Sequence, residues 1–102
     1  MSYVVRFTRG AEQNLLRLFD FLLEKDLASA RRAHAAIMKS IGYLSLFPHS
    51  CRRAEGCPAD VPLRELLIPF ANAGYVVLFE IENADTVTIL AVRHQREEDY
   101  QP

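Results

Sequence analysis

The sequence predicts an α+β domain of the order β-α-α-β-β-β, in which a helical hairpin packs on a small antiparallel sheet. Three observations predict this fold. Two amphipathic helical patterns occupy the first half of the chain, three strand-like stretches occupy the second half, and most links between them are short. The chain has 102 residues, half of them apolar and a quarter charged. This is enough for one core, so we expect a single domain over 1–102.

The first half of the chain is predicted to form one strand and two helices. Residues 3–7 are β-branched or aromatic around one arginine, which indicates a short strand. Thr8 is a suitable N-cap for the first helix, and Asp26 for the second, which Pro48 is expected to end. The apolar positions of the first helix are Ala11, Leu15, Leu18, Phe19 and Leu22, and those of the second are Ala30, Ala33, Ile37, Ile41 and Leu44. Their short polar link predicts an antiparallel hairpin.

The second half is predicted to form a loop followed by three strands. Residues 49–62 have no periodicity and contain Pro, Ser, Cys, Gly and charges, so we expect a loop there. A loop of this length in a small domain is often functional. Strand-like stretches follow at 63–70, 75–82 and 86–94, and turn-type links join them as an antiparallel meander. The stretch 75–82 is apolar on both faces, as in the centre of a sheet, and the hairpin should cover one of these faces.

Composition and charge exclude several classes of protein. No apolar run approaches the roughly 18 residues that span a bilayer, and the N-terminus lacks a signal-peptide pattern, so we expect a cytoplasmic protein. The 12 Lys and Arg residues against 13 Asp and Glu leave a formal net charge of -1, which argues against bulk electrostatic binding of nucleic acid. The four glycines are scattered and form no phosphate-binding loop, and no serine has the flanking glycines of a hydrolase nucleophile.

Three potential metal ligands, His49, Cys51 and Cys57, lie within the predicted loop. Their spacing lacks the paired pattern of a zinc site, and a fourth ligand would have to come from elsewhere. We therefore expect no metal and no cofactor. The two cysteines can also close a short disulfide, although reduced thiols are the more common state in a cytosolic chain. Both redox states remain open at this point.

Arginine outnumbers lysine ten to two, and several arginines lie in the loop and near the strand ends. Guanidinium groups favour bidentate contacts with carboxylates or phosphates, which predicts a cationic binding surface. Its members are Arg52, Arg53, Arg64, Arg93 and Arg96, with His94 and Tyr100 close to the last strand. Because Arg93 and His94 are consecutive on a strand, they should point to opposite faces of the sheet. Salt bridges with neighbouring glutamates are the alternative role for each arginine.

Taken together, these elements resemble the ParE/RelE superfamily of bacterial type II toxins. The resemblance covers nearly the whole chain and is most specific in 87–96, a valine-rich strand that runs into a His and an Arg. Its other parts are the opening 3–8, Pro48, Arg64 with Glu65, and 75–79. The resemblance implies the fold predicted above and one of two activities. ParE-like toxins bind and stall DNA gyrase, whereas RelE-like toxins cleave messenger RNA on the ribosome.

The charge of the chain favours the ParE-like activity. RNA cleavage by a RelE-like toxin uses a dense positive surface and often a C-terminal Tyr or His, roles that the resemblance would assign here to Arg64, Arg93, His94 and Tyr100. A net charge of -1 departs from that basic pattern. We therefore expect a gyrase inhibitor. A ribosome-dependent mRNA endoribonuclease and a non-toxic interaction module on the same fold remain the alternatives.

Both branches of the superfamily imply an antitoxin partner and a hetero-oligomer with it. The antitoxin tail presents apolar and acidic residues, so Arg52, Arg53 and Arg64 can pair with its carboxylates. Four apolar side chains lie off the main faces of the predicted helices and can be buried under an antitoxin helix. They are Leu16, Phe21, Leu23 and Leu46.

Overall fold

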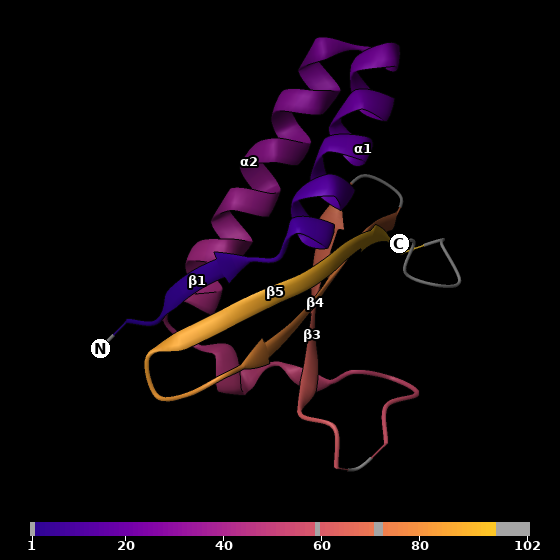
Figure 1. The fold of residues 1–102 in the computed structure, drawn as a ribbon. Helices are drawn as coiled ribbons and strands as arrows, with labels where there is room; N and C mark the ends of the chain where they lie inside the picture. The colour runs from indigo at the N-terminus through magenta and orange to yellow at the C-terminus, as the bar shows by residue number, and fades with distance from the viewer. Residues whose placement is uncertain (1, 59, 71–72, 96–102) are drawn as a thin grey trace.

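The computed structural model describes residues 2–58, 60–70 and 73–95 and confirms the predicted α+β fold (Figure 1). Two helices, α1 (Arg9–Lys25) and α2 (Leu27–Leu44), form a hairpin, and a 3-10 turn, η1 (Pro48–Ser50), follows them. The described strands are β1 (Val4–Phe7), β2 (Arg52–Arg53), β3 (Leu63–Phe70), β4 (Ala73–Ile81) and β5 (Thr86–His94).

The strands form one sheet in the order β1-β5-β4-β3-β2. The antiparallel meander of β3, β4 and β5 is confirmed. Two features were not predicted: β1 is parallel to β5, so the sheet is mixed, and β2 adds a short strand within the predicted loop. The hairpin returns the chain beside Tyr3, whose N–H donates to Ser45 O at 2.6 Å. β3 therefore starts at the same end of the sheet as β1. The chain then reverses direction between β3 and β4 and again between β4 and β5, so β5 runs parallel to β1.

The helical hairpin covers one face of the sheet, with α1 against β5 and α2 against β3 (Figure 1). The predicted apolar faces of both helices point into this core. Its buried or partly buried helical members include Ala11, Leu15, Leu18, Phe19, Leu22, Ala33, Ile37, Ile41 and Leu44. Phe79 at the centre of β4 is fully buried beneath them. We call the other side of the sheet, which the helices do not cover, the open face.

Both predicted helix caps are confirmed. Thr8 Oγ1 accepts a hydrogen bond from Ala11 N at 3.1 Å, and Asp26 Oδ1 accepts one from Ser29 N at 2.6 Å. The predicted end of α2 is wrong by three residues, because a helix stopped by Pro48 would reach Phe47, whereas α2 ends at Leu44 and Pro48 begins η1. Backbone N–H groups in the turn after Leu44 donate hydrogen bonds to the last carbonyls of the helix, so the helix is already capped before Pro48. Neither described helix has the length and apolarity required to cross a membrane.

Candidate functional site

An ion pair between Arg52 and Glu65 anchors the predicted loop to β3. The two residues are cross-strand partners, and Arg52 Nη2 lies 3.1 Å from Glu65 Oε1. The same carboxylate oxygen accepts a hydrogen bond from Glu55 N at 3.2 Å. Glu65 is only 4% exposed, and a carboxylate removed from water requires such partners. The salt-bridge alternative considered for the arginines therefore applies to Arg52.

Arg53 and Arg64 donate to backbone carbonyls of the same loop. Arg53 Nη2 donates to Pro58 O at 3.2 Å and to Val61 O at 2.9 Å. Arg64 Nη1 donates to Cys51 O at 2.6 Å. A guanidinium group offers five N–H donors in a rigid fork, so it can hold a chain segment that has no regular hydrogen bonding of its own. Three of the predicted binding arginines thus position the loop.

The last two residues of β5 point to opposite faces of the sheet, as predicted. His94 is the cross-strand partner of Tyr75, which belongs to the helix-side core, and Arg93 is the partner of Val76. The rings of His94 and Tyr75 meet edge to face with their centroids 5.7 Å apart. On the open face, Arg93 Nη1 donates to the carbonyls of His94 and Gln95 at 3.2 and 3.4 Å.

Three of the residues that the RelE resemblance implied as catalytic are described, namely Arg64, Arg93 and His94, and these three are not gathered around one point. Arg64 and His94 pair with positions of β4 that are four residues apart. This register separates them by roughly 13 Å along the sheet. Arg93 lies on the other face of the sheet from His94. The remaining predicted site residues, Arg96 and Tyr100, lie outside the described residues.

The apolar side chains predicted to lie outside the core are exposed. Leu16 is 62% exposed, Phe21 56%, Leu23 50% and Leu46 54%. Their role in antitoxin binding stays a prediction. Six further large apolar side chains are exposed and were not among the predicted site residues, namely Val4, Leu27, Met38, Tyr43, Phe47 and Leu67.

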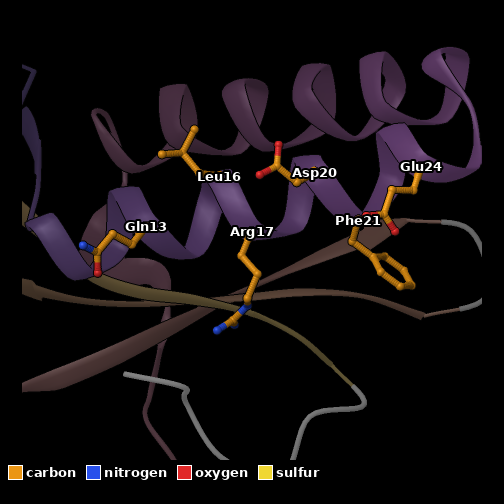
Figure 2. Close-up of a pocket in the computed structure, with 6 residues that line it drawn as sticks. All are labelled: Gln13, Leu16, Arg17, Asp20, Phe21 and Glu24. Atoms are coloured by element: carbon orange, nitrogen blue, oxygen red, sulfur yellow. The ribbon is translucent and has the colours of Figure 1, made fainter.

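Leu16 and Phe21 line a shallow groove on the outer side of α1 (Figure 2). Figure 2 shows Arg17 and Phe21 on the flank nearer the sheet and Leu16 on the other flank. The Lys25 ammonium lies 4.8 Å from the centroid of the Phe21 ring, a cation–π distance. The other lining residues are polar or charged, namely Gln13, Arg17, Asp20 and Glu24. This groove is therefore a mixed surface rather than an apolar one.

A second groove, of about 610 Å³, lies between α2 and β3. We call it the α2–β3 groove. Its walls are largely apolar and include Tyr43 and Leu46 on the helix side and Leu66 and Ile68 on the strand side. Among the described residues that line it, Lys39 is the one that carries a charge. The residues of the two walls are far apart in the sequence, so no local sequence pattern indicates this groove.

Cys51 and Cys57 are free thiols. Burial raises the pKa of Cys51, and the guanidinium of Arg64 opposes this rise. The thiol of Cys51 is therefore protonated at neutral pH, whereas the thiolate is the form that binds metals and reacts. In the part of the chain that the structure describes, no three His, Cys, Asp or Glu side chains gather closely enough to hold a metal ion.

Comparison with solved structures shows that this α+β architecture is shared with a known fold. The structure is similar to "Chromosomal ParDE TA system from P. aeruginosa", with a TM-score of 0.73 and 17% sequence identity over 90% of this chain and 95% of that chain. A family model described as the ParE toxin of the type II toxin-antitoxin system, parDE, matches residues 5–99. The chain belongs to this ParE toxin family. No curated protein matches it significantly.

Proposed function

We propose that this protein is a toxin that inhibits bacterial growth by binding DNA gyrase in the cytoplasm, and that a cognate antitoxin neutralises it. Membership of the ParE toxin family supports the toxin role and the antitoxin partner. Gyrase as the target follows from the ParE-like branch of the resemblance. The observation that favours this branch is the dispersion of Arg64, Arg93 and His94 over the sheet.

RNA cleavage requires several groups around one phosphate. A base must activate the 2′-hydroxyl while cations stabilise the charge that develops on the phosphoryl oxygens. Arg64 and His94 lie too far apart for this, and Arg93 lies on the opposite face from His94. Arg64 also donates to a carbonyl of its own loop at 2.6 Å. The arrangement supports a toxin that acts by binding a protein, as does the net charge of -1.

Expression of the protein alone in a bacterial host tests the proposal. We expect growth arrest with induction of the DNA-damage response, and we expect the purified protein to inhibit supercoiling of relaxed plasmid by gyrase. Co-expression of the protein encoded by the adjacent reading frame should restore growth.

Two results would contradict gyrase inhibition. Cleavage of messages on programmed ribosomes, abolished by Arg64→Ala while gyrase stays active, would identify a RelE-like endoribonuclease. Tight antitoxin binding without any growth effect would identify a non-toxic interaction module.

A further inference from the structure

Strand β3 has a neighbour along only the first part of its outer edge. β2 consists of two residues, which pair with Arg64 and Glu65, whereas β3 continues to Phe70. β3 lies next to the end of the sheet, so residues 66–70 have no strand on that side among the described residues (Figure 1). An uncovered strand edge presents main-chain donors and acceptors that can pair with another chain.

The register identifies which groups of β3 point outward. Alternate residues of an antiparallel strand direct both N–H and C=O to the same neighbour. Ala54 N donates to Leu63 O at 3.0 Å, so Leu63 faces the β2 side, and Leu67 and Pro69 do so by the same alternation. Proline has no N–H. Leu67 therefore supplies the one outward N–H of the described edge beyond β2, together with an outward carbonyl.

The α2–β3 groove adjoins this edge. Leu66 and Ile68, on either side of Leu67, form its strand wall. On the helix side, Tyr43 is 42% exposed and Leu46 is 54% exposed, so both offer apolar surface to a partner. A strand added at Leu67 would direct alternate side chains into this groove.

We propose that an extended segment of the antitoxin binds here by adding a strand to β3 at Leu67. The segment places an apolar side chain in the α2–β3 groove and a carboxylate beside Lys39. The charge of Lys39 favours this occupant over a second copy of the chain. A second copy could pair through β1, which carries Arg6, or through its own β3, which carries Arg64. The one acid of β3, Glu65, is already paired with Arg52, so either strand would bring a second cation toward the groove. The inference rests on the proposed function and specifies where the partner binds.

A matched pair of variants, Leu67→Pro and Leu67→Ala, tests the main-chain pairing. Both remove the leucine side chain, but only the proline removes the outward N–H. Proline is tolerated where the N–H of a strand does not bond to its neighbour, so both variants should fold and arrest growth. The probe is the adjacent-frame protein that restores growth with the parent toxin. We expect it to bind Leu67→Pro about tenfold or more weakly than Leu67→Ala, measured by calorimetry.

Hydrogen exchange on the parent protein provides a test that needs no variant. The Leu67 amide should exchange rapidly in the toxin alone and become protected in the complex. Equal affinities of the two variants together with an unprotected Leu67 amide would overturn the inference while leaving the proposed function intact. Failure of any partner to neutralise the toxin would overturn both. Protection of Leu67 in an isolated dimer, detected by light scattering, would show that a second copy occupies the edge and would also overturn it.

Discussion

The side chain of Asn14 accepts a hydrogen bond from the backbone N–H of Val92 at 3.0 Å, across 78 positions of the chain. The register of β1 against β5 ends at Ile89, so the rest of that β5 edge needs other partners. Thr8 supplies another of them, because its hydroxyl donates to Leu90 O at 3.3 Å. The first helix and its cap thus close the edge of β5 that β1 leaves open.

Asn14 is expected to contribute to stability through its hydrogen bond with Val92 N. It is 3% exposed, so Asn14→Ala would leave the Val92 N–H buried without its acceptor. We expect the free energy of unfolding to fall by about 1–3 kcal/mol in urea denaturation. Gln13→Ala, at the neighbouring exposed position, is the matched control and should change it by less than about 0.5 kcal/mol. Equal effects of the two substitutions would contradict this role.

Breaking the ion pair between Arg52 and Glu65 should loosen the 49–62 loop. Arg52→Ala leaves a buried carboxylate without its cation, which costs about 3–5 kcal/mol in a fully buried pair. The Arg52 side chain is 50% exposed, so solvent screening reduces the expected loss to about 1–2 kcal/mol. Limited proteolysis should cut the loop faster in the same variant. In a Glu65→Gln background the effect of Arg52→Ala should be smaller, and an undiminished effect would argue against the pair.

The glycines at positions 74 and 42 should respond oppositely to alanine. A Cβ at Gly74 would collide with the carbonyl oxygen of Ile68 and lie 3.2 Å from Phe70 N, both backbone atoms that cannot turn aside. We expect Gly74→Ala to cost about 1–3 kcal/mol or more. A Cβ at Gly42 in α2 meets nothing within 4 Å, so Gly42→Ala should stabilise by about 0.5–1 kcal/mol. Thermal unfolding of both variants tests this contrast. Melting temperatures that shift in the same direction in both variants would refute it.

The cap at the start of α2 should make stability depend on acidic pH. Hydrogen bonds from the backbone N–H and then the hydroxyl of Ser29 lower the pKa of Asp26 from 3.8. The carboxylate of Asp26 therefore binds a proton more readily in the unfolded chain than in the folded one. Its contribution to stability is complete at pH values above the ordinary pKa and is lost as the pH falls through the lowered pKa of the folded state. Asp26→Asn keeps a capping oxygen but cannot titrate.

Melting temperatures of the parent and Asp26→Asn, compared as pH falls, measure this effect. We expect the parent to be the more stable protein at neutral pH and its advantage to shrink as the solution becomes more acidic than the ordinary pKa of 3.8. An advantage that stays constant across this range would show that the carboxylate charge does not stabilise the helix start.

Short-range patterns were sufficient for most of the elements. The strand bounds 63–70 and 86–94 and the caps Thr8 and Asp26 depend on neighbours a few residues away, and all are confirmed. β2 escaped detection because a strand of two residues has no periodicity of its own and exists through its pairing with β3. The buried position of Asn14 was not predicted, because a polar residue beside an apolar helix face is expected to face solvent unless its distant partner is known.

The sequence alone therefore establishes a helical hairpin, a meander and the apolar face by which each helix packs, since periodicity and capping chemistry are local. The parallel pairing of β1 with β5, the uncovered edge at Leu67 and the role of each arginine depend on the tertiary structure. The residue type alone predicts that a guanidinium group donates hydrogen bonds to carboxylates, phosphates or carbonyls. Whether Arg64 binds a partner protein or its own loop depends on the strand register, which places Cys51 O 2.6 Å from Arg64 Nη1.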